Sequence, residues 1–182
     1  MSYFSPKKDD NTGATIGIDY VHHEIHDGSC YMYHDVIASL ADTVVQDYWI
    51  VTPNTTKWAH IGHMIESTGP ITVEVYEGAD RTNAKTQQTV FNRDRNNLTA
   101  ATTKVYKNNA TGTGSGGTTD GTKLVWWKGG ITSNKTTNGT IVGTENEKIL
   151  KANTNYIYRI TSHMASNLIS LSFDWYEHTN LA

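Results

Sequence analysis

Only one cysteine and three prolines occur among the 182 residues of the sequence, and no long apolar run is present. Because Cys30 has no second cysteine to pair with, the chain can form no internal disulfide and no cysteine-rich zinc site. No stretch approaches the roughly 18 apolar residues that suggest a membrane-spanning helix, and the N-terminal residues lack the apolar core of a secretion signal. We therefore expect a soluble protein that is made in the cytoplasm and has no membrane partner.

Charged residues are also scarce. They make up 18% of the chain, and the formal net charge is -3 at pH 7. Such a balance provides no strong attraction to nucleic acid, so we expect no direct nucleic-acid partner. Nucleotide-binding motifs are absent as well, because the stretch GTGSGG at 112–117 lacks the lysine and the following helix of a phosphate-binding loop.

The residues that are abundant favour strands. Thr, Asn and Gly are frequent, and the chain contains ten tyrosines and five tryptophans. β-Branched and aromatic side chains suit the pleated surface of a sheet, whereas Gly and Asn supply turns. No long segment has the period of an amphipathic helix, and 144–150 would form at most one helical turn. The composition therefore predicts an all-β protein.

A period of two locates the strands. The segment 167–178 collects its apolar residues on one face of an extended chain, where a helix would scatter them. We predict further strands at 31–40, 47–52, 57–67, 71–78, 89–97, 103–108, 123–130 and 155–163. We expect 47–78 to form a three-stranded meander, and 155–163 to pair with the last strand.

These strands are predicted to form one domain preceded by an arm. Residues 1–20 show no sustained period, and we expect a polar arm that becomes ordered only against a neighbour. Residues 21–182 are predicted to form a single antiparallel β-sandwich, jelly-roll-like, with long loops. The Gly-rich stretches 108–122 and 129–144 are predicted to be loops or hairpin tips.

The stretch VHHEIHDGSCYMYHD is rich in histidines and carboxylates. If it is extended, His22, Glu24 and His26 share one face but lie about 7 Å apart along the strand, which holds one metal ion poorly without a neighbouring strand. His60 and His63 would have to supply that strand, yet they would point to opposite faces. We therefore predict a metal-free, non-catalytic segment that ends in a Gly-assisted turn and leads into the first core strand. A metal site at His22–His26 is kept as an alternative.

No set of catalytic residues is evident. Ser29 and Cys30 lie beside the histidines without the signature of a serine or cysteine hydrolase. Glu74 and Glu77 are typical of solvated strand ends. We predict no catalytic, cofactor-binding or metal-binding residue, and no enzymatic activity.

The tryptophans divide into two groups. Trp49, Trp58 and Trp175 are expected in the core. The adjacent Trp126 and Trp127 would fall on opposite faces of a strand, where the outward ring could stack on a sugar or a protein neighbour. Alternatively, the long flanking loops cover both rings.

The order of several short sequence segments resembles that of a known group of proteins. The segments are HHEIHDG, QDYWIVTP, TKWAHI, VEVYEGADRT, TVFNRDRNN, ILKANTNYIYRITS and, last, NLISLSFDWYEHTN. From about residue 20 to residue 180, this order resembles small all-β virion proteins of tailed bacteriophages. The resemblance concerns the sequences of successive predicted strands and their order, and it includes no catalytic signature.

The resemblance implies a capsid decoration or cement protein. Such a subunit is a β-sandwich or jelly roll, commonly a homotrimer, that binds the major capsid protein on the outer surface of the virion. No site residues carry over from it. Two other functions stay open: a receptor- or carbohydrate-binding sandwich of a tail or head fibre, and a metal-dependent enzyme that uses the His22–His26 cluster.

Overall fold

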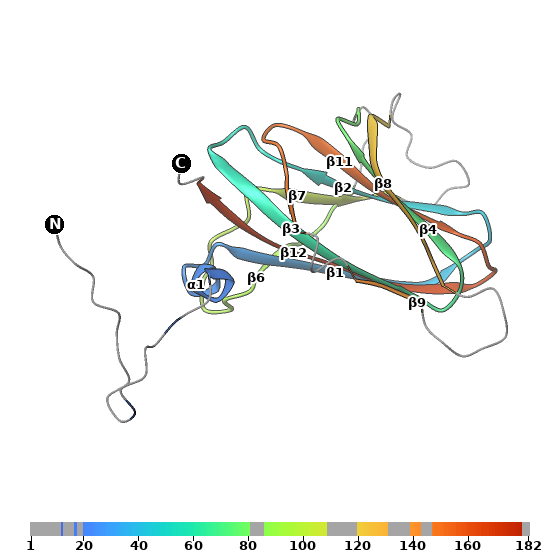
Figure 1. Ribbon diagram of the computed structural model, residues 1–182, viewed down its shortest axis with the longest axis horizontal. Helices are drawn as coiled ribbons and strands as arrows, with labels where there is room; N and C mark the ends of the chain where they lie inside the picture. Colours follow the sequence, from blue (N-terminus) through green and yellow to red (C-terminus); the bar gives the residue numbers. More distant parts are fainter. Residues whose placement is uncertain are drawn as a thin grey trace.

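The computed structural model describes Thr12, Gly17 and residues 20–80, 86–108, 120–130, 139–142 and 147–179. Two antiparallel sheets pack face to face, with one short helix at an end of the sandwich (Figure 1). In chain order the elements are α1 (Tyr20–His26), β1 (Cys30–Leu40), β2 (Val45–Val51), β3 (Lys57–Ser67), β4 (Ile71–Glu77), β5 (Thr86–Gln87), β6 (Phe91–Asn92), β7 (Lys104–Lys107), β8 (Thr122–Gly129), β9 (Gly139–Val142), β10 (Lys148–Ile149), β11 (Asn155–Ser162) and β12 (Asn167–Thr179). The predicted all-β sandwich is confirmed.

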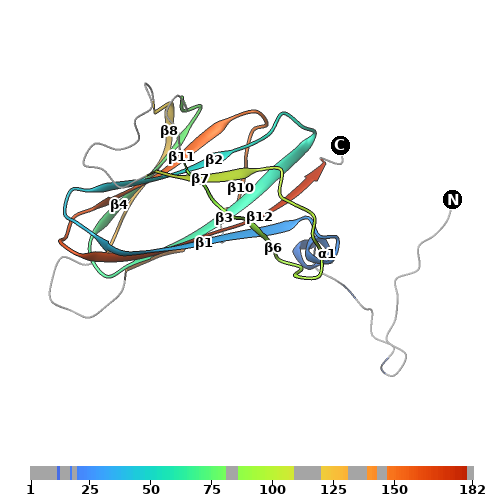
Figure 2. The same cartoon turned by 180° about the vertical axis from the view of Figure 1, so that it is seen from behind.

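The strand order is that of a jelly roll. The first sheet runs β10-β3-β12-β1-β6, with β9 also paired to β3, and the second runs β5-β7-β2-β11-β4-β8. The four strands β9-β3-β12-β1 thus oppose the four strands β2-β11-β4-β8 (Figures 1 and 2). This double Greek-key order is shared by viral capsid domains, lectins and cupins.

Two of the predicted strand pairings are wrong. The segment 47–78 is no meander, because β2 and β4 belong to the second sheet while β3 belongs to the first. Likewise β12 pairs with β1 and β3, whereas β11 pairs with β2 and β4. Alternation with a period of two is the same in a hairpin and in strands that cross between sheets, so it cannot distinguish them.

Aromatic rings from both sheets meet in the core. Phe173 of β12 contacts Tyr158 of β11 at a ring-centroid distance of 4.7 Å, and Tyr48 of β2 at 6.2 Å. All three rings are completely buried. Tyr48 also donates a hydrogen bond of 2.6 Å to Asp35, which satisfies its hydroxyl.

The tryptophans expected in the core lie in three different places. Trp175 packs in the core between the sheets, as predicted. Trp49 is also buried, but it belongs to a small cluster with Tyr76 and Ile157 on the other side of the second sheet. The prediction for Trp58 is wrong: this residue is only half-buried and lies on the outer face of β3, near the start of the strand.

The middle of the chain forms fewer strand residues than predicted. Only β6 forms within 89–97, and residues 148–149 of the predicted helical turn are strand β10. Within the predicted loop 129–144, residues 139–142 form β9 against β3. Most of the predicted arm, together with 109–119, lies outside the described residues.

Candidate functional site

The histidine-rich segment leads into β1, as predicted, but it does so as a helix and not in the extended conformation considered from the sequence. After α1 the amide of Ser29 donates to the carbonyl of Glu24, and the amide of Gly28 donates to that of Ile25, both at 3.0 Å. This is a Schellman cap, with Gly28 at a φ of 72°. The dipeptide Asp27–Gly28 suits a turn after a strand as well as it suits a helix C-cap, so the sequence does not distinguish the two.

The helix also changes which side chains of this segment lie together. His22 and His26 are one turn apart on the exposed side of α1, with their Nε2 atoms 3.0 Å from each other. Glu24 points toward the sandwich, where it is 6% exposed and accepts a hydrogen bond from the Ser29 hydroxyl. The three residues therefore do not share one face, as an extended chain would have required.

Ser29 and Cys30 are not arranged as nucleophiles. The Ser29 hydroxyl is bonded to the Glu24 carboxylate rather than to a histidine base. Burial raises the pKa of the Cys30 thiol to about 11, so that the thiol stays protonated at neutral pH. Neither Ser29 nor Cys30 is therefore activated by a neighbouring base among the described residues.

His60 and His63 lie on opposite faces of β3, as predicted. His63 points into the core, is 2% exposed and packs against Trp127 and Tyr158 at centroid distances of 5.1 and 5.3 Å. Neither of its ring nitrogens has a hydrogen-bond partner among the described residues. Burial, with a smaller effect from the charge of Lys148, lowers the pKa of His63 to about 4. His63 is therefore a neutral core residue at pH 7.

We expect His63 to make the fold sensitive to acid. Its pKa falls from 6.5 to about 4 on folding, so the unfolded chain binds the proton more tightly. Stability is then complete above pH 6.5 and is lost as the pH falls toward 4, by about 3 kcal/mol in total. Urea unfolding of the wild type and of His63→Leu at pH 7 and at pH 4 measures this loss; it should shrink by about 2–3 kcal/mol in the variant.

A core substitution that removes no titratable group supplies the control for that comparison. Ile65→Val should leave the pH dependence of the free energy of unfolding as it is in the wild type, because Ile65 lies on the same buried face of β3 as His63 but binds no proton. An equal loss of stability between pH 7 and pH 4 in the wild type and in His63→Leu would contradict the role given to His63.

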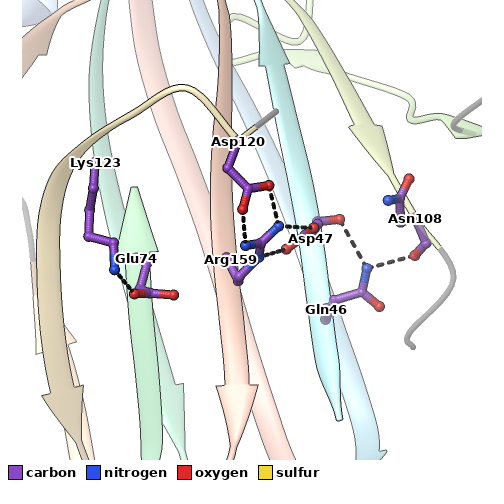
Figure 3. Close-up of polar contacts among 7 residues, drawn as sticks. All are labelled: Gln46, Asp47, Glu74, Asn108, Asp120, Lys123 and Arg159. Carbon is purple, nitrogen blue, oxygen red and sulfur yellow. Dashed lines mark hydrogen bonds and ion pairs between the residues drawn. The ribbon is translucent and has the colours of Figure 1, made fainter. Parts of the chain in front are cut away.

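A network of charges lies on the outer face of the second sheet (Figure 3). Arg159 of β11 binds Asp47 of β2 through Nε at 3.0 Å and Nη2 at 3.2 Å, and it binds Asp120 through Nη1 at 2.7 Å and Nη2 at 2.8 Å. We call these three residues the Arg159 network. Beside it, the side-chain amide of Gln46 donates to the Asn108 carbonyl at 2.6 Å.

The two carboxylates bind the same guanidinium in different surroundings. The side chain of Asp47 is 1% exposed and that of Arg159 is 11% exposed, whereas Asp120 is 37% exposed. Burial alone would lower the pKa of the guanidinium, but its bonds to Asp120 and Asp47 raise that pKa above its usual range. Arg159 therefore holds a permanent charge, and it donates four hydrogen bonds to these two carboxylates.

A second ion pair continues the network toward the edge of the sheet. Lys123 of β8 pairs with Glu74 of β4, and its ammonium lies 5.4 Å from the ring centroid of Tyr76. The Arg159 guanidinium lies 5.2 Å from the same centroid. Glu77 pairs with Lys151, and only 16% of the Glu74 side chain and 20% of the Glu77 side chain are exposed. The prediction that these glutamates are solvated strand ends is therefore wrong.

The edge strand β8 presents two apolar side chains to solvent. Trp126 is 52% exposed and Leu124 is 44% exposed, and the ammonium of Lys128 lies 5.1 Å from the Trp126 ring centroid. Trp127, on the opposite face, packs against the core. One tryptophan of the pair faces inward and the other outward, as predicted. We call Leu124, Trp126 and Lys128 the β8 edge.

This face combines fixed charges with exposed apolar surface. The Arg159 network and the Glu74–Lys123 pair hold their charges in fixed positions, and the β8 edge adds exposed apolar surface beside them. Sequence analysis missed Asp47 and Arg159. The sequence did contain a signal, because each is the single charged residue of its strand.

Comparisons with known proteins identify no relative of this chain. No protein-family model matches it, and neither the curated proteins nor the solved structures contain a significant match. In the part of the chain that the structure describes, no helix is long and apolar enough to cross a membrane. The resemblance to phage decoration proteins stays a prediction.

Proposed function

We propose that this protein is a structural component of a tailed-phage virion, which binds the major capsid protein on the outer capsid surface and stabilises the head. It does so as a homotrimer and without enzymatic activity. The observation that carries the proposal is the β8 edge, where a tryptophan and a leucine are exposed on the edge strand of the second sheet. Edge strands of proteins that stay monomeric are normally protected by charges, prolines or covering segments.

Other edge positions are exposed in the same way. Ile149 of β10 is 57% exposed, and Phe91 of β6, at the opposite edge of the first sheet, is 46% exposed. Several modest contacts of this kind gain strength when three subunits present them together, because the second and third contacts form at a high effective concentration. Jelly rolls are also common among viral capsid domains, although a fold by itself does not decide a function.

The experiment compares particles made with and without the protein. Particles that lack it should assemble normally but release DNA at a lower temperature and after a milder osmotic shock. Adding the purified protein should restore their resistance. Light scattering of the purified protein should give the mass of a trimer.

Matched variants test the part played by the β8 edge. Trp126→Ala should restore resistance poorly, since it removes the largest exposed apolar side chain of that strand. Leu98→Ala is the control, because Leu98 is 95% exposed but belongs to no strand. Unchanged resistance of particles that lack the protein would refute the capsid role.

The exposed Trp126 also favours a second function, the binding of a carbohydrate receptor. An exposed indole beside fixed carboxylates can stack on a sugar ring while the carboxylates accept its hydroxyl hydrogen bonds. In that case immobilised glycans would retain the wild type but not Trp126→Ala, and the protein would be found on fibres rather than on the head lattice.

A further inference from the structure

Two histidines meet on the outer face of the first sheet, far from the Arg159 network. His60 of β3 and His178 of β12 are 118 positions apart in the chain, yet their Nε2 atoms lie 2.8 Å from each other. Strand pairing explains the contact, because Tyr176 pairs with His60 and His178 follows two residues later on the same face.

The other nitrogen of each ring has a partner that only accepts hydrogen bonds. Nδ1 of His60 lies 2.7 Å from a carboxylate oxygen of Glu147, and Nδ1 of His178 lies 3.0 Å from the carbonyl oxygen of Thr179. Both Nδ1 atoms must therefore carry the ring proton. In two neutral imidazoles, both Nε2 atoms then present lone pairs to each other. Such a pair is attractive only if a cation is shared between them.

The same pattern of partners is typical of histidines that bind metals. A metal-ligating histidine usually donates its second N–H to a carboxylate or a backbone carbonyl, which fixes the tautomer and the orientation of the ring. Here Glu147 and the Thr179 carbonyl occupy those positions. His60 is further held by its stacking on Tyr176, with the ring centroids 4.5 Å apart and the planes inclined by 21°.

The distance between the two nitrogens also suits neighbouring ligands of one ion. Two imidazole nitrogens bound at about 2.0 Å, with roughly a right angle between them, lie about 2.8 Å apart. A tetrahedral ion would require a wider separation. Right angles between ligands are characteristic of square-planar or tetragonal Cu²⁺ and Ni²⁺, and Cu²⁺ binds imidazole more strongly than the other divalent ions of its series.

We propose that His60 and His178 form a two-histidine binding site for a divalent transition-metal ion, with Cu²⁺ preferred. Among the described residues no group of three or more His, Cys, Asp and Glu side chains could hold an ion, so the proposed site has two protein ligands within that part of the chain. A bound ion would tie β3 to the C-terminal part of β12.

The test uses the full chain without a histidine tag. His22→Ala/His26→Ala serves as the parent, because the exposed pair on α1 also brings two imidazoles together. Calorimetric titration of the parent with CuCl₂ at pH 7.5 should show one bound ion per chain, and its paramagnetic resonance spectrum should show coupling to two nitrogens. Adding His178→Ala to the parent should weaken binding at least a hundredfold, and adding Glu147→Gln should weaken it about 10–100-fold.

The melting temperature gives an independent readout. Cu²⁺ should raise it in the parent but not in the His178→Ala variant, since a ligand that binds only the folded state stabilises that state. Circular dichroism of the metal-free variants checks that they are folded. Absence of Cu²⁺ binding by the parent, or binding that His178→Ala and Glu147→Gln leave unchanged, would overturn the proposal; a proton shared by the two rings would then explain their contact.

Discussion

Asp47→Ala is expected to lower the free energy of unfolding by about 3–5 kcal/mol, because it leaves the largely buried guanidinium of Arg159 without its inner carboxylate. Asp120→Ala removes the outer carboxylate of the same guanidinium and should cost less than about 1 kcal/mol, since Asp120 is 37% exposed and water can replace it. Urea denaturation at pH 7 measures both. The two variants are matched, because each deletes a bidentate carboxylate from one guanidinium.

Removing both inner charges together provides the control. In Asp47→Leu/Arg159→Leu no inner charge is left unpaired, and Asp120 keeps its access to solvent. Most of the stability lost in Asp47→Ala should therefore return. Equal losses in Asp47→Ala and Asp120→Ala would mean that the burial of the inner carboxylate has no energetic effect.

Glu177→Ala should lower the free energy of unfolding by about 3–4 kcal/mol. This carboxylate is 3% exposed and accepts four hydrogen bonds, which come from the amide and hydroxyl of Thr102, the amide of Thr103 and the indole of Trp175. Alanine would leave these donors buried without an acceptor. The contact also holds the segment before β7 against β12, so hydrogen exchange at Thr102 and Thr103 should become faster.

Glu177→Gln separates the charge of this side chain from its shape. Glutamine keeps one acceptor oxygen but turns an NH₂ group toward donors, so an intermediate loss of about 1–2 kcal/mol is expected. If urea denaturation finds Glu177→Ala as stable as the wild type, the four hydrogen bonds do not secure this segment.

Strand positions could be predicted well where one face of a strand is buried. Residues 57–67 were predicted to the residue, and 167–178 to within one, because apolar residues recur at every second position over most of each strand. Partners could not be predicted in the same way. Nothing in 47–78 indicates whether the turns keep the chain in one sheet or carry it to the other, since each strand has to bury one face in either case.

The helix α1 and the candidate sites escaped prediction for related reasons. A seven-residue helix is too short for its period to stand out, and its C-cap uses the same Asp–Gly pair as a turn. The contact between His60 and His178 depends on the register between β3 and β12. The bonds of Arg159 to Asp47 and Asp120 depend on strand order and on the position of the segment before β8. Sequence spacing contains neither kind of information.

The strand order also determines when the protein can fold. The two strands that come last in the sandwich, β11 and β12, occupy central positions: β11 lies between β2 and β4, and β12 lies between β1 and β3. During synthesis the second sheet therefore lacks a central strand until about residue 162 has left the ribosome, and the first sheet until about residue 179. The earlier strands meanwhile have few local partners. Such high contact order slows folding to milliseconds or seconds. The nascent chain meanwhile exposes apolar strands that bind other chains readily, so its dependence on chaperones should be greatest just before β12 emerges.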